Sequence, residues 1–579
     1  MDIRKPWVVD STLSERFPVY TRGNAGEVAG MVASPLQQTV ISGWRSETAW
    51  RQALVDFGAF EETEFSPDHL DILGIVHGYI YINLSIQRVF GVRMPGASPE
   101  LMDRTYLGAS AGAPTYTPQP GDNAPQYSAR VEESIARVMS TRSRPDLDSD
   151  AHAARVLRSE RPDYSTLSDL ELIEYSNAVH ERYAADFLRK HMLMMYESSI
   201  VTGFLDQVLA SLGDPSLAVS LMGGWGGVAS AAPAQELWRL GRLVAGSKSL
   251  VKEFENGTAD VLDRLRASTG ERARTFVKEF DSFLFEYGSR STQEWDVFPP
   301  DWETHPNIVV NLVDQMRKLP EDRAPSVTGA QVREGRESLL RELRSKLGAN
   351  SEALGQLEAA VAALSVWMPA RELSKTNYIR VLHEVRLPLR ELGKRYEARG
   401  ILESFEDLAL LRLDEVEQLT TDPRVADVIA DRKRWVAELE KLEPPFVVVA
   451  GEISSPTTWE QRTGPSAAPI AASGDVLTGI AACPGTATGI ARVVLDPNEA
   501  EELEPGEILV APETDPGWTP LFTTCSGVVV NVGSPLSHAA IVSRELGIPA
   551  VLAVDQATRR IKTGTLLTVD GTAGTVTIH

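Results

Sequence analysis

Cysteine is nearly absent from this sequence of 579 residues, which contains only Cys483 and Cys525. Two thiols are too few for a disulfide framework or a four-thiolate zinc site, so we predict no metal site and expect a reducing compartment. Long hydrophobic runs are scarce as well. The best candidate for a membrane span, residues 215–235, contains four glycines and an internal proline, which make it too weakly hydrophobic. The N-terminus has no apolar targeting segment, so the sequence predicts a soluble, cytoplasmic protein.

Basic charge is also in deficit. The chain carries 57 Lys and Arg against 80 Asp and Glu, a formal net charge of −23. This balance argues against non-specific binding to nucleic acid or anionic membrane, both of which require a basic face. Phosphate groups would have to be bound by local donors. The length and the ordinary hydrophobic content of 43% predict several folded units with sizeable cores.

The chain up to about residue 445 is dominated by helical periodicity, because apolar and charged residues recur at three-to-four spacing in long blocks. The clearest blocks are Leu167–Leu212, Glu236–Leu265, Gly270–Phe285, Gln331–Met368 and Glu372–Arg399. Pro444 and Pro445 end the last helical block. We therefore predict one large, mostly α-helical region over residues 1–445.

The composition then changes twice. Residues 446–474 are rich in Ser, Ala, Pro, Thr and Gly, which predicts a flexible linker with one short strand at its start. Residues 475–579 alternate short β-rich runs with Gly, Pro, Asn and Asp turn signals, and one clear helix falls at about Ser537–Leu546. The predicted fold class is thus multidomain, with a large helical region followed by a C-terminal α/β domain.

A histidine begins the helix of this C-terminal domain. The run GVVVNV leads into a Gly-Ser-Pro turn, and Ser537 is a favourable N-cap for a helix that starts at His538. Backbone N–H groups are unsatisfied in the first turn, so a phosphoryl group on the imidazole would meet donors there. A neutral imidazole is also a nucleophile near pH 7. Without further context, a capping or core role for His538 explains the same residue.

The surrounding motif favours chemistry. GSPLSHAAIVSRELGIPAV, Gly533–Val551, and CPGTATGIARVV, Cys483–Val494, resemble the swivelling phosphohistidine domain of phosphoenolpyruvate-utilising enzymes. The resemblance implies that His538 is the catalytic phosphoryl carrier. Ser537 and Arg544 would then contact the phosphoryl group, although an ordinary ion pair explains Arg544 equally well. Leu536 replaces the Thr typical of dikinases and is similar to the rifampin phosphotransferase branch.

The helical region shares shorter motifs with the same branch. Phe17–Val40 is similar to the segment after the ATP-binding domain of rifampin phosphotransferase-like enzymes, and Tyr287–Val297 is similar to their Tyr-Gly-His-Arg…Glu segment. RELSK, residues 371–375, resembles the helix that supplies an Arg and a Lys to the acceptor site.

These motifs supply the remaining candidate binding residues. Arg371 and Lys375 are four apart, so they share a helix face and would clamp a transferring phosphoryl group. Arg290 and Glu294 would orient each other or contact the acceptor. A solvated basic patch and a structural ion pair are the alternatives for the two pairs.

Three further segments are weaker candidates. Gln37 and Gln38 are pocket candidates from the first motif. The glycine-rich MGGWGGVAS, Met222–Ser230, would wall an acceptor pocket through Trp225, but tight helix packing explains it better. GRLVAGSKS, residues 241–249, has Ser-Lys where a phosphate-binding loop needs Gly-Lys.

No ATP-grasp domain and no phosphoenolpyruvate-binding barrel are recognisable, so we expect no cofactor on this chain. The chain resembles the large subunit of two-component aryl phosphate synthases, which phosphorylate phenol or p-cresol. That resemblance implies a separate ATP-grasp subunit that binds ATP and Mg²⁺, with AMP and phosphate as products. The acceptor region would be residues 1–445 and the mobile domain residues 475–579. The alternatives are phosphorylation of an antibiotic or another alcohol, and a phosphocarrier or regulatory interaction protein.

Overall fold

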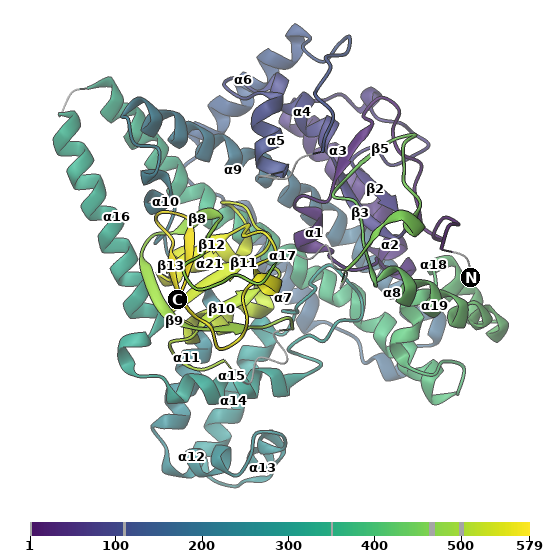
Figure 1. The fold of residues 1–579 in the computed structure, drawn as a ribbon. Helices are drawn as coiled ribbons and strands as arrows, with labels where there is room; N and C mark the ends of the chain where they lie inside the picture. Colours follow the sequence, from purple (N-terminus) through teal and green to yellow (C-terminus); the bar gives the residue numbers. More distant parts are fainter. Residues whose placement is uncertain (1–2, 108–111, 349–350, 463–468, 497–502) are drawn as a thin grey trace. The chain divides into compact units, whose positions relative to one another are not determined.

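A computed structural model describes residues 3–107, 112–348, 351–462, 469–496 and 503–579 (Figure 1). The chain divides into two compact units, each assembled from distant segments. Unit 1 comprises Met1–Ile200, Trp295–Phe298 and Asn377–Ala467, and unit 2 comprises Val201–Glu294, Pro299–Thr376 and Ala468–His579. The division thus separates the predicted helical region into two parts and groups one of them with the C-terminal domain.

Unit 1 contains a small antiparallel sheet that the helical prediction for residues 1–445 missed. Its strand order is β2-β3-β1-β5, with β1 at Val19–Thr21, β2 at Leu73–Val76, β3 at Tyr79–Asn83 and β5 at Val447–Val449. Every residue of β1, β2 and β3 is buried. Strands buried on both faces show no polar–apolar alternation, so the sequence pattern does not predict them as strands.

Helices make up most of the rest of unit 1. They are α2 (Pro35–Val40), α3 (Gly43–Phe57), α4 (Leu84–Arg93), α5 (Pro99–Leu107), α6 (Pro125–Ser140), α7 (Pro145–Ser159), α8 (Asp169–Val179), α18 (Leu413–Leu419) and α19 (Ile429–Leu439). A π-helical turn, His180–Ala184, joins α8 to α9 (Ala185–Ser211). Two helices, α9 and α17 (Glu352–Ala398), contribute residues to both units.

The helices of unit 2 agree in part with the predicted periodic blocks: the block Glu236–Leu265 is divided into three helices, and Leu217–Leu221 and Pro306–Lys318 lie outside the clearest blocks. They are α10 (Leu217–Leu221), α11 (Ala232–Ala245), α12 (Lys248–Glu255), α13 (Val261–Ala267), α14 (Glu271–Tyr287), α15 (Pro306–Lys318) and α16 (Pro325–Leu347). The block Gln331–Met368 is interrupted because Gly348 adopts a positive φ of 74° and ends α16. The rest of that block is the N-terminal half of α17.

The C-terminal part of unit 2 is the predicted α/β domain. Its eight-stranded sheet has the order β7-β14-β13-β9-β10-β11-β12-β8. The strands are β7 (Val476–Thr478), β8 (Ile480–Cys483), β9 (Thr486–Val493), β10 (Ile508–Ala511), β11 (Gly527–Val530), β12 (Ala550–Leu552), β13 (Leu566–Asp570) and β14 (Thr575–Ile578). The central pairs from β9 to β12 are parallel, and the flanking pairs are antiparallel.

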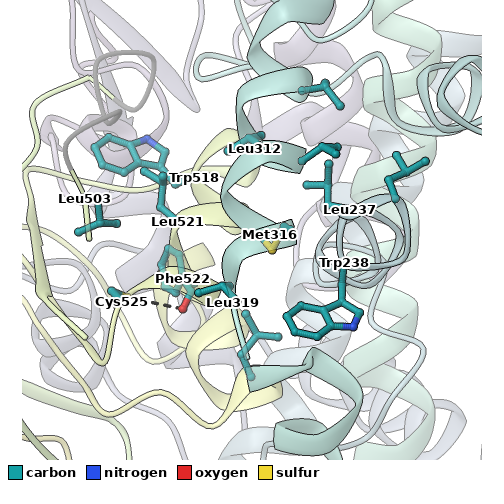
Figure 2. Packing of buried hydrophobic residues seen from close by; sticks show 14 of the residues in the cluster. Leu237, Trp238, Leu312, Met316, Leu319, Leu503, Trp518, Leu521, Phe522 and Cys525 are labelled. Carbon is teal, nitrogen blue, oxygen red and sulfur yellow. Dashed lines mark hydrogen bonds between the residues drawn. The ribbon is translucent and has the colours of Figure 1, made fainter. Parts of the chain in front are cut away.

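Three helices accompany this sheet: α20 (Thr519–Thr524), α21 (His538–Leu546) and α22 (Ala557–Arg560). Trp518, Leu521 and Phe522 on and before α20 belong to one buried hydrophobic cluster with Met316 and Leu319 of the α15 region (Figure 2). The Thr523 hydroxyl also lies 3.3 Å from the Met316 sulfur. The C-terminal domain therefore shares a core with the helices of unit 2 and is not a separately packed body in this structure.

The segment predicted as a flexible linker, residues 446–474, contains regular structure. Its start forms β5, which pairs with β1, and Glu460–Gln461 form β6, which pairs with β4 (Leu442–Glu443). Near its end, the Ala471 amide donates to the Arg560 carbonyl at 2.9 Å. Three residues of the apolar run FVVV, Val447–Val449, thus form an edge strand of the sheet in unit 1. Amino-acid composition alone does not indicate this pairing. Residues 463–468 lie outside the described residues.

One helix among the described residues, α17, is long and apolar enough to span a membrane by length and composition. A core helix of a soluble protein passes the same test. The buried Leu364 and Trp367 lie in its N-terminal half, and Leu382 and Leu389 of its C-terminal half belong to the main hydrophobic cluster of unit 1. The finding is compatible with the soluble protein that the sequence predicts.

Candidate functional site

His538 stands at the first position of α21, as its sequence predicts. Strand β11 leads into the turn, Ser537 takes the extended N-cap conformation, and Gly547 ends the helix with a left-handed φ of 68°. One detail differs from the prediction: the Ser537 side chain makes no capping hydrogen bond. Its Oγ is buried and has no hydrogen-bond partner among the described residues, so this hydroxyl is available beside the imidazole.

The imidazole of His538 contacts α20 and is influenced by the charges of two cations. Its Nε2 lies 3.3 Å from the Thr519 hydroxyl, and the Phe522 ring meets it edge-on with centroids 6.1 Å apart. Burial lowers the pKa of His538 well below its usual value, and the positive charges of Lys375 and Arg290 lower it further. The ring is therefore neutral at pH 7, the form in which histidine acts as a nucleophile.

The two cations are fixed by one buried carboxylate. Glu294 accepts from Arg290 at 3.0 Å through Oε1 and lies 3.3 Å from the Lys375 ammonium through Oε2. Arg290 also donates to the Thr376 hydroxyl at 3.0 Å. The side chains of Arg290 and Glu294 are only 2% and 1% exposed. The predicted ion pair is thus present, and it places two positive charges next to His538.

Asp515, a residue that no sequence motif singled out, joins this group. The residue caps the short 3₁₀ turn Pro516–Trp518, where its Oδ1 accepts from the Gly517 amide at 2.9 Å. Burial raises the pKa of Asp515 well above its usual value, the nearby charge of Glu294 raises it further, and Lys375 opposes the shift. The Thr-Asp-Pro turn just before an apolar helix was the available signal.

Two more hydroxyl groups are buried without a hydrogen-bond partner among the described residues. They belong to Ser230, whose carbonyl accepts from Thr519 at 3.4 Å, and to Thr514, which precedes Asp515. Buried hydroxyls are normally paired, so unpaired ones at a site containing a nucleophile indicate places for a ligand's oxygen atoms. We call this whole group, with Ser537, the phosphoryl subsite: His538, Arg290, Glu294, Lys375, Asp515, Thr519, Ser230 and Thr514.

Arg371 does not join Lys375 in that subsite. It lines a small enclosed cavity with Arg544, Glu545 and the apolar side chains Met222, Val228, Met368 and Ile541. We call this the arginine cavity. Its volume of about 20 Å³ is enough for a water molecule and too small for an aromatic ring in this conformation. The predicted clamp by two cations one helical turn apart is therefore divided between two subsites.

Both arginines of the cavity are buried. Arg371 pairs with Glu372 at 3.0 Å. Arg544 donates from Nε to the Ala482 carbonyl at 2.8 Å, and its Nη2 has no hydrogen-bond partner among the described residues. Burial lowers the pKa of Arg544 to about 10. This geometry leaves one buried N–H group of Arg544 without an acceptor among the described residues.

The glycine-rich segment 222–230 presses against α21. The carboxylate of Glu545 accepts from the backbone amides of Trp225 and Gly226, each at 3.3 Å. A Cβ on Gly223 would lie 2.9 Å from the Cβ of Arg544, so glycine is required for this approach. Trp225 stacks under the Arg336 guanidinium at 3.9 Å rather than facing an open pocket. Close packing, the alternative considered for this segment, is what the structure has.

The remaining candidates lie elsewhere. Gln37 and Gln38 belong to unit 1, where Gln37 donates to the Trp295 carbonyl at 3.1 Å. Residues 241–249 form the end of α11 and the start of α12, with Ser247 as the N-cap. A phosphate-binding loop follows a β-strand, so this segment does not have that structure.

Comparisons with known proteins match two parts of the chain. Residues 186–372 match the family described as the rifampicin phosphotransferase fourth domain, and residues 503–574 match the PEP-utilising enzyme mobile domain. The first range includes Arg290, Glu294 and Arg371, and the second includes Asp515 and His538. The two matches support the rifampicin phosphotransferase-like, PEP-utilising enzyme family and confirm the C-terminal mobile domain.

Two of the curated relatives are named as transferases. The chain is 32% identical over 336 residues to the prodigiosin synthesizing transferase PigC of Serratia marcescens, covering 56% of this chain and 36% of PigC. It is 30% identical over 336 residues to a rifampicin phosphotransferase of Streptomyces sviceus, covering 57% and 37%. The match thus spans little more than a third of each relative. An NMR structure of Enzyme I aligns with 60% of this chain and 80% of its own, at 15% identity and a TM-score of 0.14, which is too low to bear on the fold.

Proposed function

We propose that this chain is a phosphotransferase that carries a phosphoryl group on His538 and passes it to a hydroxyl acceptor. The observation that carries the proposal is the position of His538, at the start of α21 and in contact with Thr519, together with the two cations, Arg290 and Lys375, that one buried carboxylate holds in place. Phosphoryl transfer relies on positioning and on stabilising charge over the equatorial oxygens. Arg290 and Lys375 are suited to that task.

The three unpartnered hydroxyls would complete the binding of the phosphoryl group. Ser230, Thr514 and Ser537 are buried donors without a partner among the described residues. A phosphohistidine would give them oxygen acceptors. Binding would then remove the cost of burying unpaired polar groups, which contributes about 1–3 kcal/mol for each.

For the acceptor we propose a phenol or a cresol, which would give an aryl phosphate. The apolar side chains Met222, Val228, Met368 and Ile541 supply a wall for an aromatic ring once the arginine cavity widens. An antibiotic or another alcohol is the second candidate, because a matched relative is named rifampicin phosphotransferase. Both candidates use the same phosphoryl subsite.

We propose ATP as the source of the phosphoryl group, bound with Mg²⁺ on a separate ATP-grasp subunit and yielding AMP and phosphate. The support is the resemblance of the sequence to two-component aryl phosphate synthases. The mobile-domain match at residues 503–574 fits a domain that visits a second site.

Labelled ATP tests the proposal. The chain is incubated with a candidate ATP-grasp subunit, Mg²⁺ and ATP labelled in its β and γ phosphates. We expect an acid-labile, alkali-stable label on the wild-type chain and none on His538→Ala. Retained label on His538→Ala would overturn the assignment of the carrier.

A screen of acceptors then separates the candidates. Labelled chain is mixed with phenol, p-cresol, rifampicin or aliphatic alcohols, and labelled product is measured. Turnover of phenol or p-cresol supports the aryl acceptor, and turnover of rifampicin supports the second candidate. A chain that passes its label only to another protein, with Lys375→Met unchanged, would instead be a phosphocarrier.

A further inference from the structure

The phosphoryl subsite holds cations for the phosphoryl group and a nucleophile to carry it, but the reaction also moves a proton. A hydroxyl acceptor loses its O–H proton when its oxygen bonds to phosphorus. His538 already holds the phosphoryl group at that moment, so another residue has to take the proton early in the transfer. Two carboxylates of the subsite, Glu294 and Asp515, are the available groups.

Glu294 is already committed. Its Oε1 accepts from Arg290 at 3.0 Å, and its Oε2 lies 3.3 Å from the Lys375 ammonium. Both oxygens of this carboxylate thus face cations, and its charge holds the two cations in place. Glu294 is therefore a positioning residue for Arg290 and Lys375.

Asp515 is differently placed. Its Oδ1 accepts from the backbone amide of Gly517, in its own turn, at 2.9 Å. That turn is fixed against the Arg290 segment, since a Cβ on Gly517 would lie 3.0 Å from the Ser291 carbonyl oxygen. The turn leads directly into α20, where Thr519 contacts the His538 imidazole at 3.3 Å. Asp515 thus lies four residues before a residue that contacts the nucleophile.

We propose that Asp515 is the proton acceptor for the hydroxyl group that receives phosphate, an inference that rests on the proposed function. In the forward step the acceptor O–H bond breaks and its proton moves to Oδ2 of Asp515. The acceptor oxygen forms a bond to phosphorus, the bond between phosphorus and the imidazole nitrogen breaks, and its electron pair returns to the ring. In the reverse step Asp515 donates the proton to the departing oxygen.

The charges that face Asp515 suit this role. Glu294 and Glu513 raise the pKa of Asp515 beyond the effect of burial, and Lys375 lowers it. A carboxyl group with a raised pKa is a stronger base than an ordinary one and comes closer to the operating pH. The direction of each influence also provides a test, since changing a neighbour should move the titration.

The reverse reaction tests the proposal with the full chain and without an ATP-binding partner. Phenyl phosphate and p-nitrophenyl phosphate are the probes. Transfer from either probe to His538 releases the phenol and leaves phosphohistidine. Phenolate is a strong base with a conjugate-acid pKa of about 10 and leaves well only if protonated. The p-nitrophenolate ion is stabilised by its nitro group and leaves without a proton.

We expect Asp515→Asn to slow phosphorylation of His538 by phenyl phosphate by about 10²–10⁴-fold, the usual contribution of a general acid or base. The same variant should react with p-nitrophenyl phosphate within a few-fold of the wild type. The phenyl phosphate rate of the wild type should fall as the pH rises through the pKa of Asp515, because only the protonated acid can donate. This fall in rate with rising pH, called here the alkaline limb, should be absent from Asp515→Asn and restored by Asp515→Glu.

Glu294→Gln gives a second readout. Removing a negative charge lowers the pKa of Asp515, so the limb should move to lower pH, whereas Lys375→Gln should move it to higher pH. Equal loss with both probes in Asp515→Asn, or an unchanged pH profile, would overturn the proposal. Absence of any reaction above that of His538→Ala in the wild type would overturn the proposed function itself, a distinct outcome.

Discussion

The phosphoryl subsite and the arginine cavity lie one turn of α17 apart, yet they treat their cations differently. In the first, Lys375 and Arg290 share one buried carboxylate and act together on His538. In the second, Arg371 is neutralised by Glu372, and Arg544 is directed to a backbone carbonyl. A shared helix face therefore does not make two cations one site. The role of each cation depends on the acidic or carbonyl group that it binds.

The largest difference between the two subsites should appear when one cation is removed from each. Lys375→Met should lower phosphoryl transfer by about 10²–10³-fold, because a preorganised positive charge near the phosphoryl oxygens is lost. It should also raise the pKa of His538 toward its usual value, since Lys375 lowers that pKa in the folded chain. Single-turnover kinetics and NMR titration of the imidazole measure the two effects. Transfer within twofold of the wild type would place Lys375 outside the reaction.

Arg371→Met is the matched change in the arginine cavity. We expect a higher KM for an aryl phosphate with kcat nearly unchanged, which is the signature of a group that binds the ground state and the transition state alike. The pKa of His538 should stay where it is, since Lys375 and Arg290 are the charges that shift it. A loss of kcat as large as that of Lys375→Met would join the two subsites functionally.

The contact between the glycine-rich segment and α21 can be broken by a methyl group. Gly223→Ala places a Cβ 2.9 Å from that of Arg544, and such overpacking costs about 1–3 kcal/mol. Gly335→Ala in α16 is the control, because its Cβ would meet no atom within 4 Å. A helical Gly-to-Ala change in open space stabilises by about 1 kcal/mol. Urea denaturation should show opposite signs, and equal signs would contradict the close approach.

The smallest effect concerns the pH dependence of stability at Glu545. Burial raises the pKa of this carboxyl, against the backbone amides that lower it. The folded chain therefore binds a proton more readily than the unfolded chain. This group's contribution to stability falls as the pH rises from the unfolded pKa through the folded pKa. Glu545→Gln should remove that component from the free energy of unfolding measured against pH, and an unchanged slope would refute it.

The sequence predicts what is local in this protein and loses what depends on tertiary contact. The turn, N-cap and first residue of α21 were all predictable from adjacent residues, as were the C-terminal strands with their turn signals. The i, i+4 spacing of Arg371 and Lys375 correctly put both on one helix. It could not reveal that Glu294, from a distant segment, would pair with Lys375.

Two other features escaped prediction for physical reasons. Strands β1, β2 and β3 are buried throughout, so they lack the alternation that marks a half-buried strand. Asp515 was passed over because an Asp before Pro is an ordinary turn residue. Its special environment comes from Glu294 and Lys375, more than a hundred residues away in the chain.

The hydrophobic cluster between α20 and α15 sets a condition on any second site that the mobile domain visits. Trp518, Leu521 and Phe522 are almost fully buried against Met316 and Leu319 (Figure 2). Fully exposing one such side chain costs about 1.5–3 kcal/mol, so undocking into water alone would be rare. Under the proposed function, a partner that receives this domain would have to cover these side chains with an apolar surface of similar extent.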